Sequence, residues 1–281
     1  MIGTPSPAKT AIIRAILLGV GLVLLGMPSG PARAASFRLF DAMLFANSPD
    51  MSKLGFQRLP IVDAHQLWPV GASGDAPPQE QEINRIVASG AAAYGLLVID
   101  IEHWDMLDGK QREQSRNKYF ETLKLFRHAA PGLKIGFYSV LPSRDYWTPN
   151  GLQGDAGYRS WQLENDFAAP LAAGVDALFP SLYTFYPDQK GWRTYAIANL
   201  REARRIAGGK PVYCFLWPQY HDSYELISGD YWRLQLDTCH QLADGIVILG
   251  GYTQDPNFKP LPWSDDAPWW KATLQFIKSI H

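Results

Sequence analysis

Hydrophobic residues along the chain fall into two kinds of segment: short continuous runs, and longer stretches in which they recur every three or four positions. The short runs are rich in Val, Ile, Leu and aromatic residues, and turn-forming residues bound them, as in strands buried in a parallel sheet. They predict seven strands, at residues 37–44, 60–64, 95–102, 134–140, 177–183, 211–216 and 245–249.

The longer stretches between these runs predict amphipathic helices. Helical spacing is seen in three sets of hydrophobic residues: Tyr119, Leu123 and Phe126; Ala196, Leu200, Ala203 and Ala207; and Trp270, Leu274 and Ile277. Gly208-Gly209 predicts the end of the second helix, and the segment 265–268, which closes with Pro268, predicts the start of the third.

Alternating strands and helices are typical of α/β proteins with a parallel sheet. The connections that follow strands are long, at 66–79, 141–157, 184–191 and 217–229, whereas those that follow helices are short. In a (β/α) barrel the loops that follow the strands build the active site. We therefore expect one TIM-like (β/α) barrel over residues 36–281, with seven parallel strands inside an outer ring of helices. A doubly wound open sheet is the alternative.

The first 34 residues contain Lys9, Arg14 and Arg33 but no acidic residue, and an apolar run over 15–26 precedes Ala32-Arg33-Ala34. This is the pattern of a signal peptide that ends in an Ala-x-Ala cleavage site. The apolar run is shorter than the roughly 20 residues that cross a bilayer. We expect cleavage and a secreted or periplasmic protein without stable membrane insertion; an uncleaved anchor is the alternative.

Loss of these three cations leaves 23 of 26 basic residues against 27 acidic ones, a net charge of −4. A mildly acidic surface does not attract polyanions, so nucleic acid is not an expected partner. Cys214 and Cys239 are compatible with a disulfide or with two buried thiols. We favour buried thiols, because Cys214 lies in a predicted strand and Cys239 in the helix that follows it, and such a pair rarely has the geometry of a disulfide. The two cysteines and six histidines show no metal-ligand spacing, so no metal or cofactor is predicted.

The segment 95–102 ends in two acids, Asp100 and Glu102. The period of two in a strand places Val98, Asp100 and Glu102 on one face and Ile99 and Ile101 on the other, which suits packing against helices. The acids then point into the barrel, where unpaired carboxylates are costly. Repulsion and burial should raise one pKa, and this is how a Glu stays protonated as a general acid.

A purely structural interpretation of this pair is also open. Asp100 would cap a neighbouring loop, and Glu102 would pair with an arginine such as Arg144. His103 should face away from Glu102 and contact a loop or helix, and Trp104 should pack under a loop rather than stack on a sugar.

The strand with the acids resembles that of the hyaluronidase family, which reads close to Gly-Leu-Ala-Val-Ile-Asp-Trp-Glu-Glu-Trp. The matching residues are Gly95, Leu96, Val98, Ile99, Asp100, Glu102 and Trp104. Further family-like segments follow in the right order over residues 94–250: Gly136-Phe-Tyr138, Ala177-Leu-Phe-Pro-Ser-Leu-Tyr183, and Pro211-Val-Tyr213 with Pro218 and Tyr220. The chain is thus similar to a divergent, bacterial, exported relative of that family.

The resemblance implies a seven-stranded barrel and a glycosidase of the endo-N-acetylhexosaminidase type. It implies a retaining, substrate-assisted mechanism, in which the substrate's 2-acetamido oxygen attacks the anomeric carbon. Glu102 would be the general acid and base. Asp100 would orient the acetamido group and stabilise the positive oxazolinium, and Tyr183 would hydrogen-bond the acetamido group or the sugar ring. The chain departs from the family at Leu249 and Trp217, where the family has Trp and Arg, and at His103, where it has a second Glu. These changes put the acetamido pocket and a polyanionic substrate in doubt.

Without the resemblance, a second carboxylate would have to act as nucleophile or base on a sugar that lacks an acetamido group. Asp222 and Asp188 are the candidates, although Asp commonly serves turns and caps. A non-catalytic glycan-binding protein is the third possibility.

Aromatic residues are abundant in the expected site loops: Trp68, Tyr146, Trp147, Tyr186, Trp217, Tyr220 and Tyr252. Rigid aromatic rings suit the apolar faces of pyranose sugars. Together they favour a polysaccharide or glycan as the partner. The residues we expect to bind it are Tyr138, Tyr183, Trp217, Tyr220 and Tyr252.

Overall fold

The computed structural model describes residues 36–107, 109–255 and 259–280. The predicted signal peptide, residues 1–34, lies outside these ranges. The strands are all parallel and form two sheets, with orders β2-β1-β7-β6 and β3-β4-β5. Their bounds are β1 Arg38–Met43, β2 Phe56–Arg58, β3 Ile61–Val62, β4 Leu96–Ile99, β5 Lys134–Phe137, β6 Tyr213–Leu216 and β7 Gly245–Gly250.

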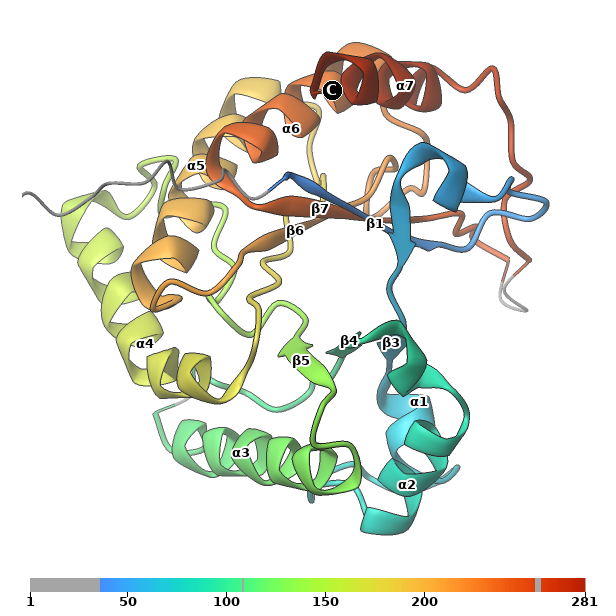
Figure 1. Cartoon of the computed structure of the whole chain (residues 1–281). Coiled ribbons are helices and arrows are strands. Elements are labelled where there is room, and N and C mark those ends of the chain that lie inside the picture. The colour runs from blue at the N-terminus through green and yellow to red at the C-terminus, as the bar shows by residue number, and fades with distance from the viewer. Residues whose placement is uncertain (1–35, 108, 256–258, 281) are drawn as a thin grey trace, which may run out of the picture. The chain divides into compact units, whose positions relative to one another are not determined.

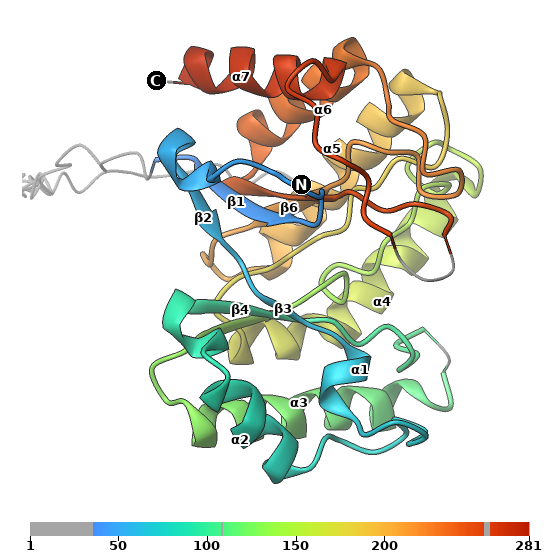
Figure 2. The same cartoon turned by 90° about the vertical axis from the view of Figure 1, so that its right-hand side faces the viewer.

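Two connections link the sheets. The chain runs directly from β2 to β3 (Figure 2), and on the way Leu59 donates a backbone hydrogen bond to Asp41 of β1, while Pro60 accepts one from Val98 of β4. On the other side, residues 177–183 form isolated parallel bridges to both neighbours, Tyr138 with Phe179 and Ser181 with Phe215. The strands therefore follow one another in chain order, and β7 pairs with β1.

Six of the seven predicted strands overlap a strand of the structure, and segment 177–183 is the exception. Pro180 lies in its middle and has no N–H to donate, so a regular ladder cannot run through it. Its backbone still accepts from Phe215 and lies between β5 and β6. The short strand β2 was not predicted, because Phe56 is its only buried residue.

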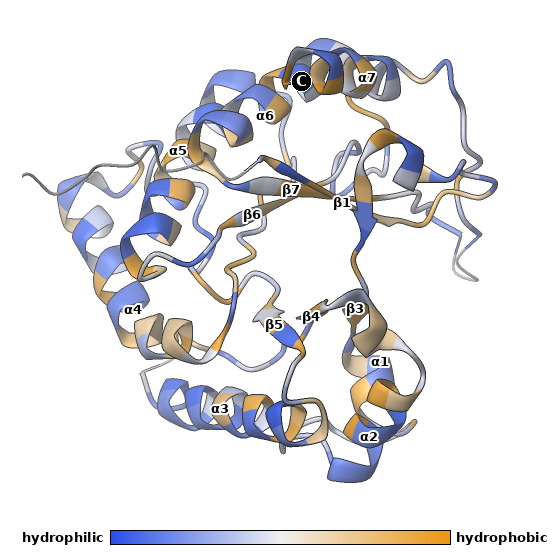
Figure 3. Cartoon of the chain, in the orientation of Figure 1, coloured by the Kyte–Doolittle hydropathy of each residue, from blue (hydrophilic) through white to orange (hydrophobic). Residues whose placement is uncertain are grey.

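Helices lie along the outer side of the strands (Figure 1). Their bounds are α1 Ala64–Leu67, α2 Glu80–Ala88, α3 Arg112–Ala129, α4 Gly154–Gly174, α5 Gln189–Ile206, α6 Gly229–Leu242 and α7 Pro268–Ile280, with 3-10 turns at Met51–Leu54 and Ala91–Tyr94. The predicted boundaries are confirmed: Gly208 and Gly209 follow α5 with left-handed φ of 58° and 83°, and α7 begins at Pro268. Hydrophilic and hydrophobic residues alternate along these helices (Figure 3).

Buried side chains form two cores. One, the strand core, holds residues of the strands, of their ends and of the two connections that join the sheets, among them Phe40, Val98, Phe179, Phe215 and Val247. The other, the helix-facing core, holds the alternate strand residues together with the buried faces of the helices. The two cores follow from the period of two, which sends neighbouring strand residues to opposite sides.

Candidate active site

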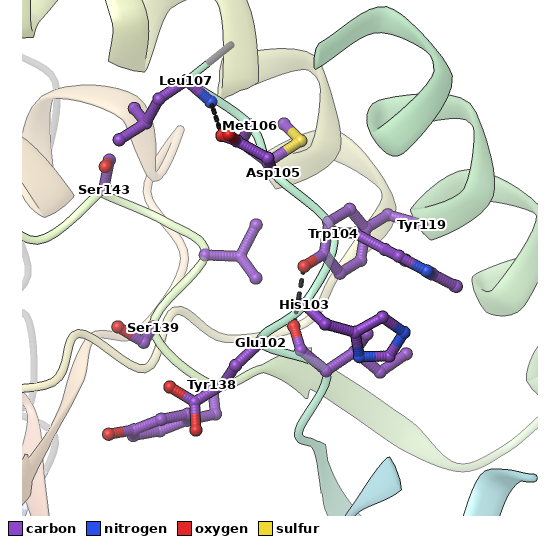
Figure 4. A pocket seen from close by; sticks show the side chains of 12 residues that line it. Glu102, His103, Trp104, Asp105, Met106, Leu107, Tyr119, Tyr138, Ser139 and Ser143 are labelled. Carbon is purple, nitrogen blue, oxygen red and sulfur yellow. Dashed lines mark hydrogen bonds between the residues drawn. The ribbon is translucent and has the colours of Figure 1, made fainter. Parts of the chain in front are cut away.

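Strand β4 delivers the acid pair as its alternation predicts. Leu96 and Val98 belong to the strand core, whereas Leu97, Ile99 and Ile101 belong to the helix-facing core. The carbonyl of Ile101 accepts a hydrogen bond of 2.7 Å from the Tyr119 hydroxyl on α3, which anchors the segment after the strand (Figure 4). The chain between Asp100 and Glu102 is therefore fixed from the helix side.

Asp100 is a half-buried carboxyl, and one of its oxygens lacks a hydrogen-bond partner among the described residues. Its backbone N–H donates to Val62 of β3, but its Oδ1 is buried and has no hydrogen-bond partner among the described residues. Burial, then the neighbouring charges of Glu102 and Asp63, raise its pKa to about 7. Four other buried side-chain atoms of the described residues also lack a partner, but Asp100 differs from them because it lines a cavity and lies beside a second acid.

Glu102 is exposed at the end of the same segment. The ion pairs found in the described part of the chain involve neither Glu102 nor Asp100. Arg144, the partner in the structural interpretation, instead has its guanidinium 4.8 Å from the centre of the Phe185 ring. The sequence predicted that one acid of the pair has a raised pKa, and in the structure this is Asp100, which is more buried than Glu102.

Three hollows surround the pair. The Glu102 cavity, of about 370 Å³, is lined in part by Glu102, Tyr138, Ser139 and Ser143 (Figure 4). The Asp100 cavity, of about 190 Å³, is lined in part by Asp63, Asp100, Tyr138, Tyr183, Leu249 and Tyr252. The His65 cavity, of about 380 Å³, is lined by Asp63, Ala64, His65, Asp100, Glu102 and His103. Each acid lines two of the three hollows.

A chain of hydroxyl groups lies beside Asp100. Tyr183 hydrogen-bonds Tyr138, whose hydroxyl donates to Ser181 Oγ at 2.9 Å. Burial raises the pKa of both tyrosines, so they stay protonated at any pH of interest. Both hydroxyl protons are donated within this chain, to Ser181 and to Tyr138, so the two tyrosines place fixed hydroxyl oxygens at the wall of the cavity that holds the unpartnered carboxyl oxygen.

Of the five predicted substrate-binding residues, Tyr138, Tyr183 and Tyr252 line the Asp100 cavity. Trp217 packs behind them, with ring centroids 5.3 Å from Tyr183 and 5.1 Å from Tyr252, and only 5% of it is exposed. Its indole N–H donates to Gln219. Tyr220 is half-buried, packs against the helix-facing core and lines none of the three hollows.

Sequence reasoning missed Asp63 and Arg58, which also line the Asp100 cavity. Asp63 directly follows β3 as Asp100 directly follows β4, and Ile61-Val62-Asp63 repeats on a smaller scale the apolar run followed by an acid. Asp63 also caps α1, where its Oδ1 accepts from the Gln66 backbone N–H. Arg58 lies 3.3 Å from Asp41.

The neighbours of Glu102 behave as predicted. His103 Nε2 and Trp104 Nε1 both donate to the carbonyl of Gly74, at 2.9 and 2.8 Å, in the loop after α1. Trp104 is 4% exposed and packs beneath that loop. These contacts hold loop 69–76 beside the acids.

The fallback carboxylates have other contacts. Asp188 is the N-cap of α5 and accepts from Gly191 N–H, as the turn-and-cap interpretation predicts. Asp222 is 75% exposed and pairs with His221 at 2.9 Å. Neither lines one of the three hollows.

Comparison with known proteins adds to this geometry. No protein-family model matches the chain, and no curated protein matches its sequence. Among solved structures, bee venom hyaluronidase superposes with a TM-score of 0.60 at 18% identity, over 87% of this chain and 97% of that one. The fold is similar to that of bee venom hyaluronidase. A second structure of that enzyme, in complex with a hyaluronic acid tetramer, gives a TM-score of 0.57 at 18% identity, over 87% and 96%.

Cys214 and Cys239 are buried free thiols. Burial, and then the hydrogen bond that the Cys239 thiol donates to the neighbouring Cys214, raise the pKa of Cys239. Within residues 36–107, 109–255 and 259–280, no group of three His, Cys, Asp or Glu side chains is placed to hold a metal ion. In the same ranges, no helix is both long and apolar enough to cross a membrane.

Proposed function

We propose that the chain is an exported glycoside hydrolase that cleaves a glycan containing N-acetylhexosamine. The observation that carries the proposal is the pair at the end of β4: exposed Glu102 beside Asp100, whose buried Oδ1 has no partner among the described residues. A free acceptor of this kind, walled by tyrosines, fits a ligand that brings its own N–H.

The finer fold belongs to the same proposal. We take the chain as a closed seven-stranded (β/α) barrel, in which residues 177–183 supply one strand and 56–62 supply another. The bridges of 177–183 and the hydrogen bonds of Leu59 and Pro60 support closure, because they join the two sheets on both sides. The acids then lie at the carboxyl end of the strands, the usual place for a barrel active site.

The proposed reaction needs no nucleophile from the enzyme. The acetamido oxygen of the substrate attacks the anomeric carbon, while Glu102 gives its proton to the glycosidic oxygen that leaves. Asp100 accepts the acetamido N–H and stabilises the oxazolinium cation. In the second step Glu102 takes a proton from water, which attacks the same carbon and restores the acetamido group. The anomeric configuration is retained.

The contacts of the other acids support this choice over a mechanism with a separate carboxylate. Asp222 is exposed and paired with His221, and Asp188 caps a helix. Asp63 is close to Asp100 but already accepts from Gln66. Each is engaged elsewhere, whereas the Asp100 oxygen is not.

The size and chemistry of the Asp100 cavity support an acetamido group as its occupant. Leu249 lines this cavity where the hyaluronidase family has a tryptophan, so an apolar wall is kept with a smaller side chain. Tyr138 and Tyr183 line the same cavity and supply hydroxyl oxygens. A methyl group against Leu249 and an amide toward Asp100 and the tyrosines would satisfy both.

A screen of acetamido polysaccharides, with a thiazoline that mimics the oxazoline, tests the mechanism. We expect release of new reducing ends and inhibition by the thiazoline. Turnover that the thiazoline leaves unchanged would indicate a separate carboxylate such as Asp222. Saturable binding without turnover of any polymer would indicate a non-catalytic glycan-binding protein.

Export is the remaining part of the proposal. It rests on the basic start, the apolar run and Ala32-Arg33-Ala34. N-terminal sequencing of the protein recovered from the periplasm or medium should begin at Ala35. Recovery of the whole chain in the membrane fraction would instead show an uncleaved anchor.

A further inference from the structure

Two large aromatic rings remain exposed on the loops beside the candidate active site. Trp147 is 47% exposed and Tyr186 is 38% exposed, and their ring centroids lie 5.3 Å apart. Trp147 belongs to the loop after β5, and Tyr186 follows the segment 177–183. Both loops leave the same ends of the strands as the loop that carries Glu102. We call this pair the aromatic platform.

A third ring and backbone hydrogen bonds hold the aromatic platform in place. The ring of Tyr146 lies 5.1 Å from each of the two rings. The Trp147 backbone N–H donates to Asp145 Oδ1 at 2.8 Å, and the Asn150 side-chain amide donates to the Tyr146 carbonyl at 2.8 Å. The rings are therefore exposed but ordered, which reduces the entropy lost when a ligand binds.

Aromatic rings connect the platform to the Asp100 cavity. From Tyr183 in the cavity wall, the next centroid is that of His221 at 6.2 Å, followed by Phe185 at 4.5 Å. Tyr186 lies 6.4 Å beyond Phe185. Arg144 covers Phe185 midway along this row, with its guanidinium 4.8 Å from the ring centre. The row leads from the reacting centre to the platform.

We propose that Trp147 and Tyr186 form a sugar-binding subsite that holds a pyranose unit remote from the bond that is cleaved. The inference rests on the proposed function, because it takes the row of rings as the path of one glycan chain. A pyranose ring presents C–H groups on its face and hydroxyls at its edge. The platform presents two exposed aromatic rings tilted by 52° to one another, and none of the hydrogen bonds found among the described residues uses the Trp147 indole N–H or the Tyr186 hydroxyl.

Such a subsite would make the enzyme depend on chain length. A short oligosaccharide fills the cavities around Asp100 and Glu102 and does not reach the platform. A longer chain also covers Phe185 and Arg144 and stacks on the two rings. Loss of the platform should therefore weaken the binding of long substrates and leave the binding of short ones unchanged.

The experiment compares Trp147→Ala and Tyr186→Ala with Tyr94→Ala. Tyr94 is a matched control, because it is 55% exposed but precedes β4, at the opposite strand end from Glu102. Each variant is combined with Glu102→Gln, and its affinity is measured by calorimetry for hyaluronan and N-acetylglucosamine oligomers of two and six units. The same variants without Glu102→Gln are assayed for kcat/KM on both lengths.

We expect the platform variants to lose about tenfold in affinity and kcat/KM on the six-unit oligomer that the protein prefers, a difference of about 1.4 kcal/mol. The two-unit oligomer and the Tyr94→Ala variant should change less than about twofold, and Trp147→Phe should recover most of the loss. Equal losses on both lengths, losses matched by Tyr94→Ala, or no binding of any six-unit oligomer would overturn the subsite.

Failure of the proposed function gives a different result. If the protein binds six-unit oligomers through Trp147 but cleaves none, the subsite stands and the hydrolase does not. If it cleaves them and Trp147→Ala has no effect that depends on length, the hydrolase stands and the subsite does not.

Discussion

Replacement of Asp100 by Asn should stabilise the protein above neutral pH while it removes activity. The side chains have the same size, but Asn cannot ionise. The folded protein raises the Asp100 pKa from 3.8 to about 7, mainly through burial and then through Glu102 and Asp63. The ionised carboxylate is therefore more costly in the folded state than in the unfolded chain.

The sign and size follow from proton linkage. Between pH 3.8 and about 7 the unfolded chain has lost the Asp100 proton, whereas the folded protein keeps it, so stability falls as pH rises through this window. At about 1.36 kcal/mol per pH unit, the full difference is about 4 kcal/mol. Solvent at this half-buried carboxyl screens part of it, so we expect about 2–4 kcal/mol.

The assay is urea unfolding of both proteins at pH 4 and pH 8. The free energy of unfolding of Asp100→Asn relative to the native protein should be higher at pH 8 than at pH 4 by the amount above. Asp222→Asn is the control, because that carboxylate is 75% exposed, and its effect should stay within about 0.5 kcal/mol at either pH. An Asp100→Asn effect that is equal at the two pH values, or larger at pH 4, would refute the reasoning.

Two further predictions concern residues around the pair. Asp63→Asn keeps a side-chain oxygen to cap α1 but removes a negative charge near Asp100, so it should lower the Asp100 pKa. Because Asp100 acts in the proposed reaction as an ionised acceptor, the rise of kcat/KM with pH that follows its ionisation near pH 7 should move to lower pH. If the pH dependence of kcat/KM does not move, the charge of Asp63 does not affect the ionisation of Asp100. Gly136→Ala would place a Cβ 2.4 Å from the Phe179 ring and 2.5 Å from the Ala177 carbonyl, which should destabilise the protein by about 1–3 kcal/mol in urea unfolding. An unchanged free energy of unfolding in that variant would mean that segment 177–183 can shift to accommodate the added methyl group.

The sequence predicted features that depend on local pattern. Alternation in 95–102 placed Val98 and Ile99 in different cores, and Gly208-Gly209 marked the end of α5. These are properties of neighbouring residues. The resemblance of the segments around Tyr138 and Tyr183 to a family pattern also predicted two residues that line the Asp100 cavity.

Features that depend on tertiary packing could not be predicted in the same way. Segment 177–183 has the composition of a strand, but Pro180 interrupts its ladder. The pKa of Asp100 is raised because the fold buries this acid more deeply than Glu102. Alternation along a strand predicts which face a side chain lies on, but not how deeply it is buried. Trp217 looked like a binding residue by type and place, yet it packs behind Tyr183 and Tyr252.

Turnover by the Glu102→Gln variant tests the central claim most directly. Gln keeps the size of the side chain and cannot donate the proton, and circular dichroism and the urea midpoint verify that the fold is intact. The native protein and the variant are compared for reducing-end release from the acetamido polymer that the native protein cleaves best. The account predicts a loss of about 10²–10⁴-fold, the usual contribution of a general acid. Activity within about twofold of the native protein would contradict the assignment of Glu102 as the acid, and with it the proposed mechanism.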